Sequence, residues 1–203
     1  MPSQLLIPSK PVWFSLVTPG PPVGHHRISV NMSLLTGELV LKPLFRRSRD
    51  LPAYHVSSLK PKIVIIQVGV NDLKTIPLFP ESRNAIVANC QANIKRIVEE
   101  SKNLGAVVIV TTIFPVGEVP LERKPFWSDD ISRAIKEVNT YIATLAGEKI
   151  IVFDTFPILG DSQGMILPKY RSDELHLNEQ GYEILNQNLS QLLNTMEQKK
   201  VQK

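Results

Sequence analysis

Beyond residue 61, apolar residues form two kinds of pattern, and the first is the short continuous run. Residues 62–68 read KIVIIQV, in which nearly every residue is apolar and most are β-branched. Such a run is typical of a central parallel strand that is covered on both faces. The runs at 106–112 and 150–153 have the same character. The pattern therefore predicts three buried strands.

The second pattern is a spacing of three and four residues, which marks one face of a helix. It predicts a helix over 82–104, before Gly105, and a second helix from Asp129 to about Gly147. A third helix is predicted to begin near Asn178, a residue type suited to capping the first free N–H groups. The apolar positions of the three helices are, in order, Ile86, Cys90, Ile94, Ile97 and Val98; Ile131, Ile135, Val138, Ile142 and Leu145; and Tyr182, Leu185, Leu189, Leu192 and Met196.

Strands that alternate with helices predict the α/β class, with parallel strands, right-handed crossovers and helices on both faces of the sheet. In such sheets, ligands bind beyond the carboxyl ends of the strands. Two polar segments fall there, because residues 69–73 directly follow the first of these strands and residues 173–176 lie between the third strand and the last helix. We expect both segments at one edge of the sheet.

Residues 1–60 have a different composition. They hold eight of the sixteen prolines and carry a net charge of +5, whereas the rest of the chain carries −1. Residues 11–17 are compatible with a first strand and residues 34–41 with a hairpin, but no helical spacing is present. We therefore divide the chain into an irregular segment 1–60, an α/β domain 61–197 and a basic tail 198–203, which we expect to be frayed and solvated.

Length and composition limit the class of protein. With 203 residues, 43% of them apolar, the α/β part folds as one domain without a metal or a disulfide, and the single cysteine, Cys90, falls on an apolar helix face. His25 and His26 have no further ligand at a suitable spacing, so no metal or other cofactor is expected. The basic cluster at 45–49 belongs to no nucleic-acid-binding motif and is interpreted as a solvated loop. No apolar run is long enough for a membrane span or a secretion signal, so we expect a cytoplasmic protein without stable membrane insertion.

The first polar segment is Gly69-Val70-Asn71-Asp72. Gly69 leaves room for a close backbone approach, and the Asn71 amide can project above the sheet edge. An acyl-transfer enzyme needs such donors, because negative charge develops on the carbonyl oxygen of its substrate. The alternative is a simple turn, since Gly, Asn and Asp are the usual turn residues.

The second polar segment is Asp173-Glu174-Leu175-His176. A carboxylate three residues before an imidazole can accept a hydrogen bond from one ring nitrogen and leave the other free to take a proton. An imidazole, with an ordinary pKa near 6.5, suits a general base at neutral pH. The alternative is that Asp173 caps a turn and His176 is a surface residue.

At these residues the chain resembles a known family. The strand followed by residues 69–72, and residues 173–178 with Gly181-Tyr182 in the last helix, resemble the third and fifth sequence blocks of the SGNH (GDSL-type) hydrolases, over about residues 60–196. The resemblance implies esterase or lipase chemistry on a flavodoxin-like, three-layer α/β/α sandwich. It also implies that Asn71, beside Gly69, binds the oxyanion, that His176 is the general base, and that Asp173 orients it.

The family's other two blocks are degraded in this chain. The family nucleophile lies in a Gly-Asp-Ser block at the end of the first strand, and the nearest equivalent here is Ser15, which lacks both the Gly and the Asp. In the second block, Val30 stands where the family has a glycine, and its branched side chain would crowd the backbone approach. Ser15 is the preferred nucleophile because of its position at the end of a candidate strand.

A literal Gly-Asp-Ser occurs at residues 160–162 and even completes a G-x-S-x-G motif with Gly164. That motif needs a sharp strand-to-helix turn to expose the hydroxyl. The segment around Ser162 instead runs toward Pro168 with no room for a helix, so we interpret it as a loop. Ser162 remains the second candidate nucleophile.

The sequence therefore predicts a hydrolase that cleaves a small-molecule, lipid or carbohydrate ester by serine acyl transfer. Phe126 and Trp127 are candidates to line an acyl pocket. The alternative is a catalytically inactive relative that serves as a binding or structural domain. Neither the particular ester nor the oligomeric state follows from the sequence.

Overall fold

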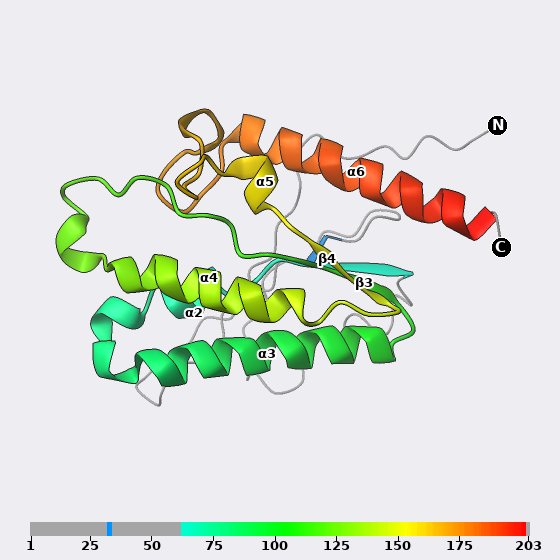
Figure 1. Ribbon diagram of the computed structural model, residues 1–203, viewed down its shortest axis with the longest axis horizontal. Coiled ribbons are helices and arrows are strands. Elements are labelled where there is room, and N and C mark those ends of the chain that lie inside the picture. Colours follow the sequence, from blue (N-terminus) through cyan, green and yellow to red (C-terminus); the bar gives the residue numbers. More distant parts are fainter. Residues whose placement is uncertain (1–31, 34–61, 202–203) are drawn as a thin grey trace, which may run out of the picture.

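The computed structural model describes residues 32–33 and 62–201, which form a four-stranded sheet with helices on both faces (Figure 1). The strands lie in the order β1 (Met32–Ser33), β2 (Ile63–Ile66), β3 (Val107–Thr111) and β4 (Ile150–Phe153). β2, β3 and β4 are parallel, and β1 pairs with β2 in the antiparallel direction. The predicted α/β class with a parallel sheet is confirmed.

Alternate residues of the strands face opposite layers, which explains why the predicted runs are apolar throughout. Val64, Val108 and Val110 pack in one core cluster with the buried positions of α3 (Arg83–Asn103) and α4 (Asp129–Ala143). Ile65 and Ile109 belong to another cluster, with Leu193 of α6 (Glu179–Val201). Figure 1 shows the sheet between α6 on one side and α3 with α4 on the other. Both faces are therefore covered by apolar side chains.

The long helices begin close to their predicted positions, and two of them begin with a side-chain cap. The hydroxyl of Ser128 accepts a hydrogen bond from the N–H of Asp130 at the start of α4, at 3.1 Å. The side-chain oxygen of Asn178 accepts one from the N–H of Gly181 at the start of α6, at 3.0 Å. Each cap satisfies an N–H group that has no partner inside the helix.

The C-terminal boundary differs from the prediction, because α6 continues to Val201 and includes most of the segment expected to be a frayed tail. Residues 198–201 are polar or charged apart from Val201, so no apolar face marked them as helical. Straight-chain Gln and Lys residues nevertheless favour a helix once it has begun.

Two short α-helices follow the strands, α2 (Val70–Leu73) after β2 and α5 (Phe156–Leu159) after β4. In the described part of the chain, the connecting segments also contain four 3-10 helices: η1 (Ile76–Leu78), η2 (Pro80–Ser82), η3 (Lys124–Phe126) and η4 (Pro168–Tyr170). The strand predicted at 11–17, the hairpin predicted at 34–41 and the basic cluster at 45–49 lie outside the described residues. So do Ser15, His25, His26 and Val30. Within the described ranges, no helix has the length and apolar character needed to cross a membrane.

Candidate active site

The carboxyl ends of the parallel strands open onto three segments at one end of the molecule, on the left in Figure 1. These are α2 after β2, the loop between β3 and α4, and the loop between α5 and α6. The backbone N–H of Gly117, in the second segment, donates to the carbonyl oxygen of Glu174, in the third, at 2.8 Å. The predicted site segments therefore lie along one edge of the sheet.

Asp173 and His176 are in direct contact. The ring nitrogen Nδ1 of His176 lies 2.8 Å from Oδ2 and 3.0 Å from Oδ1 of Asp173. The His176 side chain is 70% exposed although Asp173 contacts its Nδ1. A neutral imidazole that donates from Nδ1 to a carboxylate keeps its lone pair on Nε2, where a base is needed.

The Asp173 carboxylate also organises the loop. Its Oδ1 accepts hydrogen bonds from the backbone N–H groups of Leu175 and His176, both at 2.8 Å. Partial burial raises the pKa of Asp173, but the hydrogen bonds from Leu175 and His176 outweigh it, so the pKa lies below the ordinary value of 3.8. The carboxylate is thus held ionised in the position where it accepts from the ring. Asp173 both caps the turn and contacts the imidazole, which are the two alternatives that the sequence left open.

The segment after His176 is fixed to the loop before it. The side-chain amide of Asn178 donates to the carbonyl oxygen of Lys169 at 2.8 Å, and the backbone N–H of Asn178 donates to that of Tyr170 at 3.0 Å. A Cβ on Gly181 would lie only 2.4 Å from the Tyr170 oxygen. The first turn of α6 therefore needs glycine at this position to approach the loop so closely.

Gly69 and Asn71 lie at the carboxyl end of β2. Gly69 is buried with a φ of +112°, and a Cβ there would lie 2.7 Å from the side chain of Ile113, which follows β3. Both the backbone conformation and the space favour glycine. Asn71 is half-buried in the single turn of α2, whose first carbonyl, that of Gly69, accepts from the N–H groups of Asp72 and Leu73. The segment is a helical turn, which places Asn71 at the sheet edge.

Contacts connect these segments in sequence along the edge. Gly69 contacts Ile113, and Ile113 is fixed to α4 because its N–H and C=O both bond to the side chain of Asn139, at 2.7 and 2.9 Å. Four residues after Ile113, Gly117 bonds to Glu174. The structure therefore brings Asp173 and His176 into contact. The close approach of Asn71 to His176 stays a prediction.

Ser162 lies in a tight turn between α5 and α6. Oδ1 of Asp161 accepts from the N–H groups of Gln163 and Met165, at 2.8 and 3.0 Å, and Gly164 has a φ of +80°. This turn neither follows a strand nor enters a helix, so it lacks the setting that a G-x-S-x-G nucleophile requires. Ser15 lies outside the described residues.

Sequence reasoning missed an ion pair next to the histidine, whose carboxylate is buried and whose guanidinium is partly exposed. The side chain of Glu174 is only 3% exposed, and its carboxylate contacts the guanidinium of Arg123 from the loop between β3 and α4. The two residues are 51 positions apart, and no periodicity or motif connects them. The sequence offered only the position of Glu174 inside the block at 173–178 as a signal. Among the described residues, no group of three His, Cys, Asp or Glu side chains is arranged to hold a metal ion.

Comparisons with known proteins agree with the fold. Residues 35–184 match the family model described as the GDSL-like lipase/acylhydrolase family. Similar solved structures include a GDSL-like lipase from Bacteroides thetaiotaomicron VPI-5482, with 24% identity and a TM-score of 0.55 over 70% of this chain and 66% of that one. Another is described as an acylhydrolase from Bacteroides fragilis NCTC 9343, with 22% identity and a TM-score of 0.52 over 70% and 65% of the two chains. This chain thus spans about two thirds of the length of both. No curated protein matches it.

Proposed function

We propose that this chain, which belongs to the GDSL-like lipase/acylhydrolase family, hydrolyses carboxylic esters by transferring the acyl group to a serine. The observation that supports the proposal most strongly is the contact between Asp173 and His176. It holds Nδ1 of the ring against a carboxylate, while most of the side chain remains exposed. A turn without a catalytic role would need Asp173 as its cap, but it would not need contact between Asp173 and the histidine ring.

The proposed reaction has two steps. In the first, the Ser15 hydroxyl attacks the ester carbonyl while Nε2 of His176 takes its proton, and the developing oxyanion is stabilised by the Asn71 amide. Asp173 stabilises the imidazolium that forms. His176 then returns the proton to the departing alcohol as the C–O bond breaks, which leaves an acyl-serine. In the second step, water attacks the acyl-serine through the same base, releasing the acid and restoring the serine.

Ser15 is proposed as the nucleophile on two grounds. Within residues 62–201, the His176 ring hydrogen-bonds to Asp173 and to no serine, and Ser162 is held in the turn capped by Asp161. The attacking hydroxyl is therefore sought in the N-terminal segment. There, Ser15 occupies the position that resembles the family's nucleophile block.

A catalytically inactive relative that binds an ester without cleaving it is the second candidate. The observation in its favour is the sequence around Ser15 and Val30, where the glycines of the family's two N-terminal blocks are missing. We also propose a cytoplasmic location, since the single cysteine, Cys90, cannot form an internal disulfide.

Turnover of a short-chain p-nitrophenyl ester by the purified full-length chain tests the proposal. We expect Ser15→Ala and His176→Ala to reduce kcat/KM to the level of the uncatalysed reaction, and Ser162→Ala to leave it unchanged. Circular dichroism of each variant serves as the control for folding. If only Ser162→Ala lost turnover, Ser162 and not Ser15 would be the nucleophile. Unchanged turnover in His176→Ala would exclude the mechanism. Absence of turnover in the wild-type chain would favour the inactive relative.

A further inference from the structure

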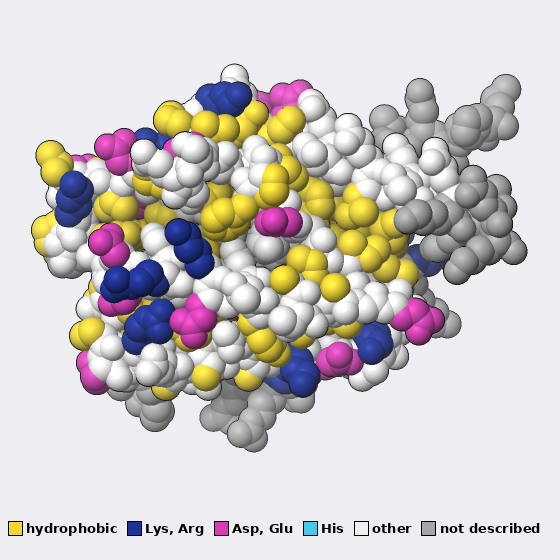
Figure 2. All heavy atoms as spheres, viewed as in Figure 1, with side chains coloured by type: hydrophobic (Ala, Val, Ile, Leu, Met, Phe, Trp, Pro, Cys, Tyr) yellow, Lys and Arg dark blue, Asp and Glu magenta, His cyan; other side chains and the backbone are white. Residues whose placement is uncertain are grey.

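A cavity of about 530 Å³ lies between α4, α5, the loop 116–127 and the turn at 163–165. Its volume is within the range of ordinary small-molecule sites, roughly 300–1,000 Å³. In Figure 2, apolar side chains show on this face of the molecule, with Lys or Arg and Asp or Glu side chains close by. The apolar residues that line it are Val116, Val119, Trp127, Ile135, Phe156 and Met165. Trp127, one of the two candidates for lining an acyl pocket, is among them.

The cavity shares a wall with the loop that carries the histidine. Gly117 lines the cavity, and its N–H bonds to the carbonyl oxygen of Glu174, between Asp173 and His176. A Cβ on Gly117 would lie 3.3 Å from the Cα of Glu174 and 2.8 Å from the side chain of Arg171. A larger residue at this position would require the Arg171 side chain to move and would crowd the backbone of Glu174. One residue of the cavity lining is therefore hydrogen-bonded to the loop that carries Asp173 and His176.

The charges that line the cavity are unequal. Lys124 and Lys136 line it, and within the described part of the chain neither has a carboxylate within ion-pair distance. Of the two acidic residues in the lining, Glu118 is paired with Arg171 at 3.2 Å, whereas Asp129 is in no ion pair with another described residue. Among the described residues, the lining thus has two exposed cations and one anion without an ion pair, which favours a ligand with a negative charge.

We propose that this cavity holds the acyl chain of the substrate, and that Lys124 and Lys136 bind an anionic group at the far end of that chain. The preferred substrates are then esters whose acid carries a second carboxylate, such as the half-esters of medium-length dicarboxylic acids. The proposal rests on the ester hydrolase function proposed above, because it assigns the substrate class of that same site. It adds a binding subsite made of residues that the structure describes. Ligand binding to this subsite can be measured without measuring turnover.

The first experiment measures binding. The chain has two tryptophans, so Trp13→Phe leaves Trp127 in the cavity as the only indole reporter. Octanoate is the anionic probe, and octan-1-ol is a neutral probe with the same number of carbons. We expect both to change the Trp127 fluorescence, with octanoate binding about tenfold more tightly, since two partly exposed ion pairs contribute.

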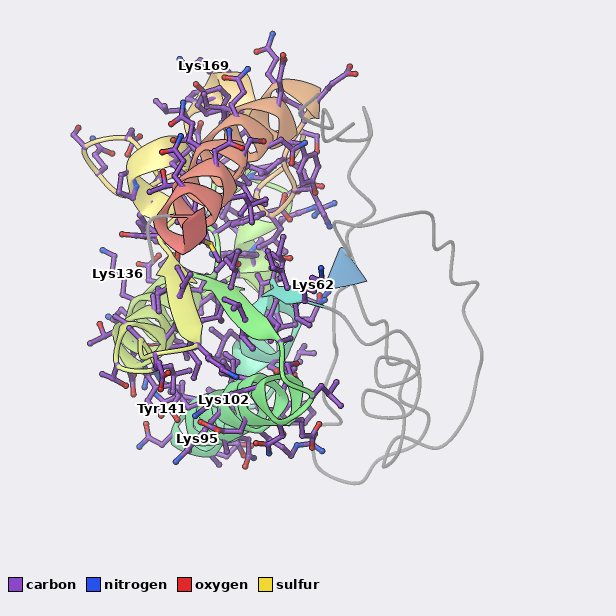
Figure 3. The ribbon with its side chains drawn as sticks, turned by 90° about the vertical axis from the view of Figure 1, so that its right-hand side faces the viewer. Lys62, Lys95, Lys102, Lys136, Tyr141 and Lys169 are labelled. Atoms are coloured by element: carbon purple, nitrogen blue, oxygen red, sulfur yellow. The ribbon has the colours of Figure 1, made fainter. Side chains whose placement is uncertain are left out.

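Variants then test the residues. Lys124→Gln with Lys136→Gln should weaken octanoate binding to the level of octan-1-ol. Lys95→Gln, a change on α3 away from the cavity lining, should have no effect; Figure 3 shows Lys95 well separated from Lys136. Ser132→Phe fills the cavity from α4 and should abolish the binding of both probes. Equal affinities for the two probes, or binding that survives Ser132→Phe in a folded variant, would overturn the proposal.

The second experiment separates the two proposals. With p-nitrophenyl hydrogen suberate, the Lys124→Gln/Lys136→Gln variant should raise KM about tenfold with an unchanged kcat, and with p-nitrophenyl octanoate it should change neither. Turnover that depends on Ser15 and His176 but shows no such rise in KM would overturn the subsite alone. Octanoate binding without any turnover would overturn the hydrolase function and leave the anionic ligand in place.

Discussion

The Asp173→Asn substitution separates the two roles of Asp173. Oδ1 accepts from the backbone N–H groups of Leu175 and His176, and an asparagine oxygen can keep both bonds. At the other oxygen, 2.8 Å from Nδ1 of His176, asparagine places an NH₂ group, which donates. The only acceptor left for Nδ1 is then Oδ1 at 3.0 Å, which already accepts from two backbone N–H groups. The ring therefore favours the tautomer that keeps Nδ1 unprotonated and holds its proton on Nε2. In that tautomer it cannot act as the base.

The two effects differ greatly in size. Loss of the charged acceptor should cost about 1 kcal/mol of folding stability, because the side chain is 37% exposed and two neutral hydrogen bonds remain. The wrong tautomer should lower kcat by about 10⁴, the effect known for the corresponding change in serine proteases. The fold is thus nearly kept while turnover is lost.

Asp161→Asn is the matched control. Asp161 caps its own turn in the same way, with Oδ1 accepting from the N–H groups of Gln163 and Met165, but within residues 62–201 it has no hydrogen bond to a histidine. We expect the two variants to lose similar stability in urea unfolding and only Asp173→Asn to lose p-nitrophenyl ester turnover. If Asp173→Asn retained turnover within about threefold of the wild type, or both variants lost it equally, the orienting role of Asp173 would be refuted.

Three further predictions follow from the packing and the pKa shifts. Because its pKa is lowered in the folded state, Asp173 stabilises the fold at pH values above about 4. In urea unfolding, the difference in stability between wild type and Asp173→Asn should therefore shrink as the pH falls from about 5 to 2. A constant difference would contradict this. Gly181→Ala should lower the free energy of unfolding by roughly 1–3 kcal/mol, because its Cβ would meet the Tyr170 carbonyl oxygen; an unchanged midpoint would count against the packing at the start of α6. Burial raises the pKa of the Cys90 thiol, and the neighbouring Asp72 raises it further. Iodoacetamide should therefore alkylate Cys90 at pH 8 only after the chain unfolds. Rapid labelling of the folded chain would contradict the burial of Cys90.

Much of the fold could be predicted because each apolar run has one preferred arrangement. The strand at 150–153 is found with the predicted bounds, and Asn178 caps the last helix as its residue type suggests. The apolar face of α6 predicts the helix, but its continuation to Val201 runs through Gln198, Lys199 and Lys200, which do not extend that face. The two-residue strand β1 is too short to leave any periodic signal.

The candidate site was predictable where its parts are close in the sequence. Asp173 and His176 are three residues apart, so a single loop brings them into contact. The ion pair of Glu174 with Arg123 and the approach of Gly117 to the same loop join segments more than 50 residues apart. Such contacts arise from packing at the sheet edge, which no local pattern encodes.

The central claim is that His176, oriented by Asp173, activates a serine of this chain. The most direct test treats the purified protein with a fluorophosphonate, which phosphonylates activated serines, and maps the modified residue by peptide mass spectrometry. The account predicts one modified residue, Ser15, in the wild-type chain and no modification in His176→Ala. Modification of Ser162, modification that persists in His176→Ala, or a wild-type chain that remains unmodified would contradict it.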